Sequence, residues 1–262
     1  MRIVYLNLDR REDRRAWMEG QAAALGLFFE RVRAFDGKEI EYDPAGDSGL
    51  SLGAYACFLG HRAIWQSIAE GDEPFAVVLE DDVHLSKDAA AFLSDDGWIP
   101  PDVDLIHLER ERSQCLVWNG SRVKAGKRSL YRLAGECAGA AAYVISRRCA
   151  QILSDELTNP VMEFDHILFS RDYVTKVNIL KLHPAIAIQD AVQKRRKKRD
   201  FGSDNPSNTR HFPDQAGAEA KPEFKFGQKL NREVRRLMRF TRDRFVEMTG
   251  SNEVIKKKFQ FK

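Results

Sequence analysis

Three adjacent carboxylates, Glu80-Asp81-Asp82, are the residues in this sequence best suited to do chemistry. They follow residues 75–79, an apolar run with two valines that is typical of a strand buried on both faces. Open α/β sheets bind ligands at the carboxyl ends of their strands, and three bare charges there repel one another. Oxygen ligands of this kind select Mg²⁺ or Mn²⁺. The triplet therefore predicts a divalent metal site, unless it caps a helix or faces solvent.

A second candidate ligand site lies near the N-terminus. Residues 3–8 predict a buried strand, and the polar turn after it carries Arg10, Arg11, Arg14 and Arg15 into a helix. A strand that leads into an Arg-bearing helix start is a common way to hold a nucleotide or phosphate, through backbone N–H groups and guanidinium. Arg10 and Arg15 fit a solvated helix face better. Arg11 and Arg14 stay open between the two interpretations.

A third candidate is Asp165, which lies inside the otherwise apolar segment 161–169. A carboxylate among apolar residues needs a hydrogen-bond partner, a bound proton or a functional role. Asp165 is therefore either a buried helix N-cap or a functional group. His61 lies on the helix predicted from Ser51 onward. A single histidine on a helix is more often structural than catalytic.

The elements that must position these residues predict an α/β fold with a mainly parallel sheet flanked by helices. Further strands are expected at residues 28–35, 103–108, 142–146 and 177–182. Helices are expected before Gly26, from Ser51 to Ile68, over 87–93 and over 147–157. Residues 113–134 lack clear periodicity and predict a hairpin or a mobile loop, and such loops often cover a site at a strand end.

Charge divides the 262 residues unevenly. Residues 225–262 hold twelve Lys/Arg and four Asp/Glu, a net charge of +8, whereas the whole chain has a formal net charge of only +3. Residues 194–224 are poor in apolar side chains and contain Gly, Pro, Asn and Asp throughout, which predicts a linker. We therefore expect a domain at 1–193, a linker at 194–224 and a basic helical tail at 225–262.

The tail has the pattern of a basic amphipathic helix. Its apolar residues recur at i+3 and i+4 spacing, with Lys and Arg around them: Phe226, Leu230, Val234, Leu237, Met238, Thr241 and Phe245. Such a helix suits an anionic membrane surface, or docking onto the protein's own core or onto a second subunit in a homodimer. Nucleic-acid binding ranks well below these, because aromatic platforms and known motifs for it are lacking.

The cysteines and the N-terminus bear on the compartment. The chain has four cysteines, Cys57, Cys115, Cys137 and Cys149. They include no C-x-x-C pair and are too sparse for a disulfide framework, so we expect them to be reduced and to serve as packing residues. Charges from Asp9 onward come too early for a signal peptide, and no apolar run approaches the roughly 20 residues of a membrane span. We therefore expect a cytoplasmic protein. Its basic tail could attach it peripherally to the inner face of the cytoplasmic membrane.

Six motifs, taken in order, resemble glycosyltransferase family 25, the lipooligosaccharide-type β-galactosyltransferases whose relatives include collagen galactosyltransferase domains. They span about residues 1–190, and their shared order is stronger evidence than any one of them. They are Val4-Tyr5-Leu6-Asn7-Leu8-Asp9-Arg10-Arg11 with Asp13-Arg14, residues 33–37 (Arg-Ala-Phe-Asp-Gly), Gly53 through Cys57 to His61, residues 79–83 (Leu-Glu-Asp-Asp-Val), residues 142–146 (Ala-Tyr-Val-Ile-Ser) and Asp165.

The resemblance implies a GT-A-like domain that transfers a hexose from UDP-galactose or UDP-glucose, with inversion, to a glycan or glycolipid acceptor such as lipopolysaccharide core. It implies a Mn²⁺ or Mg²⁺ ion bound directly by Asp82, with Glu80 or Asp81 reaching the ribose or metal-bound water. The nucleotide side of the pocket would be formed by Asn7, Arg11, Arg14 and Asp36.

An inverting transferase needs one base that takes a proton from the acceptor hydroxyl. Asp165 is our candidate for this base, and Glu136 and Asp190 compete with it.

Two residues depart from the family pattern. The family usually has an acidic residue after the glycine at position 53 and a serine before the histidine at position 61, where this chain has Ala54 and Gly60. A degenerate member that only binds sugar or a partner is therefore the alternative. A phospho-receiver is excluded because its acidic pair would follow the first strand closely. A phosphatase is excluded because Asp9 is followed by Arg10 and Arg11.

Overall fold

The computed structural model describes residues 1–40, 50–111, 114–120, 123–135, 137–160, 163–169, 176–193 and 254–262. The strands are β1 (Arg2–Asn7), β2 (Glu30–Arg33), β3 (Phe75–Glu80), β4 (Val83–Leu85), β5 (Leu105–His107), β6 (Cys115–Trp118), β7 (Val123–Ala125), β8 (Arg128–Arg132), β9 (Ala142–Ser146), β10 (Ile179–His183), β11 (Ala187–Gln189) and β12 (Val254–Lys257). The helices are α1 (Glu12–Leu25), α3 (Leu52–Ala69), α4 (Ala90–Leu93), α5 (Arg147–Glu156), α6 (Phe164–Leu168), α8 (Asp190–Gln193) and the 3-10 turn η1 (Gly37–Glu39).

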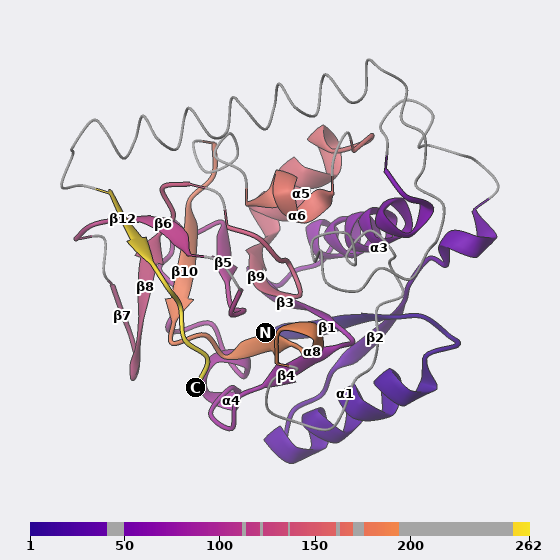
Figure 1. Cartoon of the computed structure of the whole chain (residues 1–262), viewed down its shortest axis with the longest axis horizontal. Helices are drawn as coiled ribbons and strands as arrows, with labels where there is room; N and C mark the ends of the chain where they lie inside the picture. Colours follow the sequence, from indigo (N-terminus) through magenta and orange to yellow (C-terminus); the bar gives the residue numbers. More distant parts are fainter. Residues whose placement is uncertain are drawn as a thin grey trace, which may run out of the picture.

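A central eight-stranded sheet has the order β2-β1-β3-β9-β5-β10-β8-β7. Helix α1 covers one face, and α3, α5 and α6 lie over the other (Figure 1). Two short ribbons, β4 with β11 and β6 with β12, complete the strand pairing. The α/β class predicted from the sequence is confirmed.

The sheet is mixed, so the prediction of a mainly parallel sheet was wrong. β1 pairs parallel with β2 and β3, and β5 with β10, but β9 runs antiparallel between β3 and β5. β8 is antiparallel to both β10 and β7. The local pattern of a buried strand is the same in either direction, because direction depends on how the connections return the chain to the sheet.

Alternate residues of the central strands supply two separate cores. Val4, Val78 and Tyr143 belong to the core beneath α3, α5 and α6. Tyr5 and Leu79 belong to the core on the α1 side. Because successive side chains of a strand point to opposite faces, a sheet covered on both sides needs continuous apolar runs, as this sequence has.

Two helix boundaries follow from single residues. Gly26 ends α1 in the left-handed conformation, with φ of 66°, and its N–H bonds to carbonyls of the last turn. Ser51 begins α3, because its side chain accepts a hydrogen bond from Ala54 N. Both boundaries agree with the sequence prediction, and the second one matters for the pocket because the first turn of α3 lines it.

The described segment 254–262 begins with a strand, β12. β12 pairs antiparallel with β6, and Phe259 beyond it is buried against Tyr131 and His183. The prediction of a helical tail was therefore wrong for residues 254–257, where β-branched Val254 and Ile255 meet the edge of β6. The amphipathic pattern at 226–245 and the predicted linker lie outside the described residues.

The prediction of four reduced cysteines was wrong for one pair. Cys115 and Cys137 form a disulfide that ties the start of β6 to the segment before β9, whereas Cys57 and Cys149 are free. The two partners are 22 residues apart, and only the return of β8 to the sheet brings them together. Among the described helices, none combines the length and the apolar character that crossing a bilayer requires.

Candidate active site

The carboxyl ends of β1 and β3 open into a pocket. The two strands run parallel, with Leu6 opposite Glu80, so the residues that follow them lie side by side at one edge of the sheet. The cavity has a volume of about 450 Å³. Its walls come from these strand ends, the segment after β2, the first turns of α3, the segment before β9 and the start of α6. The strand-end site expected from the sequence is therefore a true concavity.

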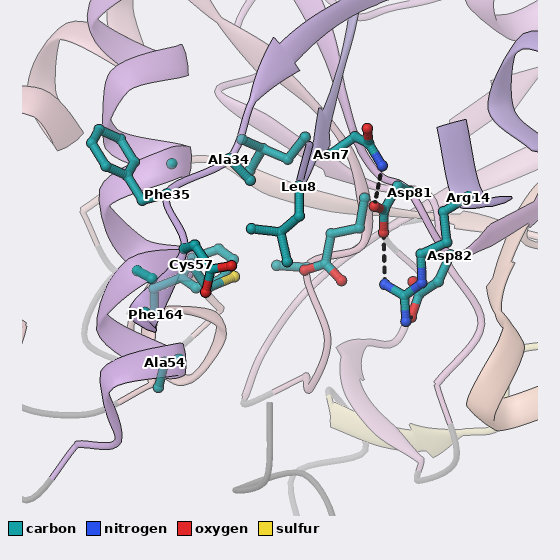
Figure 2. A pocket seen from close by; sticks show the side chains of 18 of the residues that line it. Asn7, Leu8, Arg14, Ala34, Phe35, Ala54, Cys57, Asp81, Asp82 and Phe164 are labelled. Carbon is teal, nitrogen blue, oxygen red and sulfur yellow. Dashed lines mark hydrogen bonds and ion pairs between the residues drawn. The ribbon is translucent and has the colours of Figure 1, made fainter. Parts of the chain in front are cut away.

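Polar and apolar groups occupy different sides of this pocket. Figure 2 shows Ala54, Cys57 and Phe164 beside α3 and, across the cavity, Asp81, Asp82 and Arg14. The lining residues that matter below are Asn7, Arg10, Arg14, Phe35, Asp36, Ala54, Cys57, Gly60, Glu80, Asp81, Asp82, Gly139, Phe164, Asp165 and Gln189.

Asp81 is held by two buried donors (Figure 2). Arg14 Nη1 donates to Oδ1 at 2.7 Å, and Asn7 Nδ2 donates to Oδ2 at 2.7 Å. Asn7 is itself fixed, since its Oδ1 accepts from Arg31 Nε at 2.9 Å. All three partners in this arrangement, Asp81, Arg14 and Asn7, are buried. The charge of Asp81 is therefore compensated within the protein, and the ion pair joins α1 to the end of β3.

The charges of Glu80 and Asp82 are compensated less closely, since Arg14 Nη2 lies 3.8 Å from Asp82 Oδ2. Burial is the main cause that raises the pKa of Glu80 to about 7, with the charges of Asp81 and Asp165 adding to it. Burial and the charge of Glu80 likewise raise the pKa of Asp82 to about 7. Glu80 Oε2 accepts one hydrogen bond, from Gln189 Nε2 at 3.0 Å. Asp82 Oδ1 is buried and has no hydrogen-bond partner in the described part of the chain.

These two carboxylates fit a divalent cation. A bound cation favours the charged form of both groups and would give Asp82 Oδ1 the partner that it lacks. The available ligands are carboxylate oxygens, which is the chemistry that Mg²⁺ and Mn²⁺ prefer. Asp81 contributes less, because both of its oxygens already accept hydrogen bonds.

Three of the four residues predicted for the nucleotide side line the pocket. They are Asn7, Arg14 and Asp36; Arg11 is not among the lining residues. The guanidinium of Arg11 pairs with Asp13 at 2.8 Å and lowers the pKa of that carboxyl to about 2. Arg11 therefore stabilises the first turn of α1 beside the pocket.

Arg10, which the sequence assigned to a solvated face, lines the pocket together with Asp36. Arg10 Nε donates to Asp36 Oδ2 at 2.8 Å, and the other oxygen of Asp36 accepts from Lys38 N at 3.0 Å. These bonds lower the pKa of Asp36, so it is ionised. The pair places a cation and an anion at the rim beside the exposed ring of Phe35.

Asp165 lies at the start of α6 and lines the pocket. Its Oδ2 accepts from Gly139 N at 3.1 Å, and its Oδ1 accepts from His166 N at 2.8 Å. Glu163 is the residue in the N-cap position, and Asp165 lies two residues further on, in the first turn. Asp165 therefore stabilises the helix start and also presents a carboxylate to the cavity.

The two competitors for the role of base differ from Asp165. Asp190 is buried outside the pocket lining, and its carboxylate bonds to His84 Nε2 at 2.8 Å. Its backbone N–H bonds to the carbonyl of Asp82 at 2.9 Å, so it supports the strand end. Glu136 lies outside the described residues.

The α3 wall contains a buried histidine. His61 Nδ1 lies 2.9 Å from the hydroxyl of Tyr143, which also accepts from Trp65 Nε1 at 2.8 Å. Burial lowers the pKa of His61 to about 3, so the imidazole is neutral. One turn earlier, Cys57 lines the pocket, and burial together with the charge of Glu80 raises the pKa of its thiol.

Sequence reasoning missed Gln189, Cys57 and Phe164 as pocket residues. Gln189 ends β11, and it reaches Glu80 only because β11 pairs with β4 beside the end of β3. Such contacts depend on tertiary pairing, for which the sequence offers no local signal. The Cys57–His61 spacing of four did offer one, because i and i+4 lie on the same helix face.

Comparison with known proteins assigns the sequence that forms this pocket to a family. The family model described as glycosyltransferase family 25 (LPS biosynthesis protein) matches residues 1–168, which include every described candidate residue except Gln189 and Asp190. The chain belongs to glycosyltransferase family 25.

Two curated relatives of this family-25 chain are bacterial. The lipooligosaccharide biosynthesis protein lic2B of Haemophilus influenzae is 28% identical over 151 residues, covering 54% of this chain and 55% of the relative. The lacto-N-neotetraose biosynthesis glycosyltransferase LgtB of Neisseria gonorrhoeae is 29% identical over 161 residues, covering 54% and 57%. The chain thus spans about half the length of these relatives.

Among solved structures, a glycosyltransferase involved in glycosylation of the major capsid of PBCV-1 aligns with a TM-score of 0.42 at 11% identity, covering 72% of this chain and 91% of that one. This similarity is too distant to inform the mechanism.

The two positions at which this family-25 member departs from the usual pattern both line the pocket. Ala54 occupies the first turn of α3 and has no side-chain polar group. Gly60 packs against β1, where a Cβ would lie 2.9 Å from Leu6 Cδ2. The glycine thus lets α3 approach β1 closely, and a larger residue requires Leu6 to move.

Proposed function

We propose that this protein is a metal-dependent inverting hexosyltransferase with a GT-A-like nucleotide-sugar-binding domain. It moves galactose or glucose from a UDP-sugar to a saccharide acceptor of a bacterial surface glycan such as lipopolysaccharide core. The observation that carries the proposal is the pocket at the ends of β1 and β3, where Glu80 and Asp82 have raised pKa values and Asp165 faces the same cavity.

The donor's diphosphate requires positive charge. Asp82 and Glu80 would hold the Mn²⁺ or Mg²⁺ ion, which acts as a Lewis acid that offsets the charge of the departing phosphate. Arg14 holds Asp81 in place through a 2.7 Å hydrogen bond, and Arg10 adds a second guanidinium at the rim. Guanidinium groups suit phosphate recognition because their donors are planar and permanently charged. Asn7 and Asp36 complete the nucleotide side.

Inversion requires a base on the acceptor side. The carboxylate of Asp165 takes the proton of the acceptor hydroxyl as the hydroxyl oxygen forms a bond to the anomeric carbon. The bond from that carbon to the diphosphate oxygen breaks, and UDP leaves with the electron pair. The backbone N–H groups of Gly139 and His166 hydrogen-bond to the carboxylate and fix its orientation. The side chain of Asp165 therefore loses little conformational entropy when the acceptor binds.

The acceptor class rests on the relatives. The printed names of two relatives refer to lipooligosaccharide and lacto-N-neotetraose biosynthesis, so a bacterial glycan or glycolipid is the acceptor that we propose. The apolar α3 side of the pocket, with Ala54 and Phe164, supports a sugar face more readily than a second charged group.

Calorimetric titration with UDP tests the metal-dependent donor site. We expect UDP to bind in Mn²⁺ or Mg²⁺ and to bind at least tenfold more weakly with a chelator present. Asp82→Asn should abolish the metal effect, whereas Asp72→Asn, which changes an exposed carboxylate three residues before β3, should retain it. Equal UDP affinity with and without chelator would contradict the proposal.

The same proteins separate the enzyme from its degenerate alternative. An active transferase releases UDP from UDP-galactose or UDP-glucose and extends lipooligosaccharide acceptors. A chain that binds UDP with metal but extends no acceptor in a panel of truncated lipooligosaccharides would be the sugar-binding module that Ala54 and Gly60 suggest.

We also propose that the basic stretch at 225–253 attaches the protein to an anionic membrane surface, where glycolipid acceptors lie. The support is its charge and apolar periodicity, since each Lys or Arg near such a surface contributes about 1 kcal/mol. Replacing Arg232, Arg235, Arg236 and Arg239 with Gln should weaken sedimentation with anionic vesicles at least tenfold. Vesicles of neutral lipid serve as the control. Unchanged sedimentation, or a charge-independent self-association on gel filtration, would instead favour docking between subunits.

A further inference from the structure

We propose that Cys57, His61 and Glu80 form a binding site for a thiophilic divalent cation such as Zn²⁺, adjacent to the oxygen-ligand site at Asp82 and sharing Glu80 with it. One sulfur, one ring nitrogen and one carboxylate oxygen from these side chains all lie within 4.8 Å of one another. The three residues are contributed by two rigid elements, α3 and the end of β3. The proposal concerns a second cation and does not depend on transferase activity.

The helix supplies two ligands on one face. Cys57 and His61 are four residues apart on α3, and residues at i and i+4 project from the same side of a helix. Glu80 meets this face from β3, with 3.8 Å between His61 Nε2 and Glu80 Oε1. Zinc bonds of roughly 2.0 to 2.3 Å in a tetrahedral site hold ligand atoms roughly 3.3 to 3.7 Å apart. Only small side-chain shifts separate the observed arrangement from that geometry.

His61 is oriented as a ligand. It is fully buried, and its Nε2 has no hydrogen-bond partner within the described residues. Its other ring nitrogen, Nδ1, is held by the Tyr143 hydroxyl, which Trp65 fixes in turn. Histidines that bind metals typically use one ring nitrogen for the ion and bond the other to an orienting group. An unpartnered buried nitrogen aimed at a thiol and a carboxylate therefore points to a cation.

The donor set selects the cation. Sulfur and imidazole ligands favour Zn²⁺, whereas Mg²⁺ and Mn²⁺ favour oxygen ligands. Three protein ligands leave a fourth position open, as in zinc sites that exchange a ligand. Cys57 and Glu80 both line the pocket, so this position opens toward the cavity. On binding, the Cys57 thiol releases its proton to solvent and the sulfur bonds to the ion.

Sharing of Glu80 couples the two cation sites. Glu80 neighbours Asp82 in the chain, and the charge of Glu80 is one of the causes that raise the pKa of Asp82. A cation held by Cys57 and His61 would draw Glu80 toward α3 and away from Asp82. The pocket thus contains two adjacent cation sites of different chemistry that compete for one carboxylate.

Cobalt substitution tests the site without any substrate. Co²⁺ added to the full-length protein should produce a thiolate-to-metal charge-transfer band in the near ultraviolet, and Zn²⁺ should displace it at one equivalent. Cys57→Ser should remove the band and weaken Zn²⁺ binding, measured with a chromophoric chelator, at least 100-fold. Cys149→Ser changes the other free cysteine, which lies in α5 outside the pocket, and should retain both signals.

Three further variants keep the test decisive if Cys57→Ser folds poorly. Glu80→Gln should keep the charge-transfer band but bind Co²⁺ at least tenfold more weakly, because a carboxylate ligand is lost while the thiolate stays. Asp82→Asn should leave the band unchanged. His166→Ala removes one member of a second, half-buried cluster of candidate ligands, which also contains Glu163 and Asp165, and it should not alter the band. No band in the wild-type protein, or a band that persists in Cys57→Ser, would overturn the proposal.

Discussion

The guanidinium of Arg14 donates a hydrogen bond of 2.7 Å to the carboxylate of Asp81, and both side chains are buried. This ion pair gives Asp81 a different environment from its neighbours Glu80 and Asp82 at the end of β3. Asp81 accepts this buried hydrogen bond, whereas the pKa values of Glu80 and Asp82 are raised to about 7. Adjacent residues of the same chemical type therefore have different properties, because Arg14 of α1 donates a 2.7 Å hydrogen bond to Asp81 but lies 3.8 Å from Asp82.

Removing the cation of this pair should destabilise the fold strongly. Arg14→Met leaves Asp81 as a buried charge with only Asn7 as donor, and breaking a buried pair in this way costs about 3 to 5 kcal/mol. Urea denaturation monitored by circular dichroism measures the loss. Arg15→Met serves as the control, because Arg15 forms an exposed pair with Glu19 and solvent screens such a pair, so its loss should leave stability nearly unchanged.

The double variant distinguishes charge from packing. Combining Arg14→Met with Asp81→Asn removes the uncompensated charge and should recover at least half of the lost stability. A double variant that is as unstable as the sum of the single variants would show that the pair contributes through packing alone.

Stability should fall as the pH rises toward 7 in the absence of divalent cations. The folded pKa values of Glu80 and Asp82 lie above their ordinary values, so between about pH 4 and pH 7 the folded state binds protons that the unfolded chain has released. Their contribution is therefore favourable at low pH and is lost through this window. Asp82→Asn removes part of this dependence and should be more stable than wild type by roughly 2 kcal/mol at pH 8.

Denaturation curves at pH 4 and pH 8 with a chelator present provide the measurement. The stability difference between Asp82→Asn and wild type should shrink to less than about 0.5 kcal/mol near pH 4. Adding Mn²⁺ at pH 8 should stabilise the wild-type protein and not the variant, because a ligand bound by the folded state alone stabilises it. A difference that is constant across pH would contradict the raised pKa of Asp82.

Asp165→Asn should lower hexose transfer by about 10² to 10⁴-fold, because an amide cannot accept the acceptor's proton. Donor affinity should stay within about twofold, since the asparagine oxygen can still accept the hydrogen bond from Gly139 N. Steady-state transfer rates and UDP titration measure the two effects separately. Glu163→Gln, a neighbouring carboxylate at the same helix start, is the matched control. Equal losses in both variants would remove Asp165 from the role of base.

The C-terminal strand should be required for stability. Phe259→Ala removes a ring that is 1% exposed and packs against Tyr131 and His183, at a cost of about 3 to 5 kcal/mol. Phe261→Ala, a less buried aromatic two residues further, should cost less than half as much. Thermal and urea denaturation report the difference. An unchanged midpoint for Phe259→Ala would show that residues 254–262 do not pack on the core in solution.

Local signals were sufficient for the elements that carry the site. The apolar run before Glu80 predicted β3, and Ser51 and Gly26 predicted the boundaries of α3 and α1, because each of these signals acts within a few residues. The acidic triplet at a strand end predicted a ligand pocket, because strand ends and ligands coincide in open α/β sheets.

Contacts between distant segments were not predictable in the same way. The direction of β9, the pairing of β12 with β6 and the Cys115–Cys137 disulfide each depend on where a connection returns. The different properties of Asp81 and Asp82 depend on one guanidinium that α1 brings to the strand end. The sequence of the acidic triplet alone does not indicate which of its carboxylates this guanidinium contacts.

Because β12 rejoins the core beside β6, the stretch at 194–253 is bracketed by two anchored elements, α8 before it and β12 after it. A chain segment with one covalent attachment lets its domain swivel, whereas one with two attachments constrains the domain's orientation. If, as proposed, the basic residues of this stretch bind a lipid surface, the two covalent attachments would limit the rotation of the domain relative to that surface.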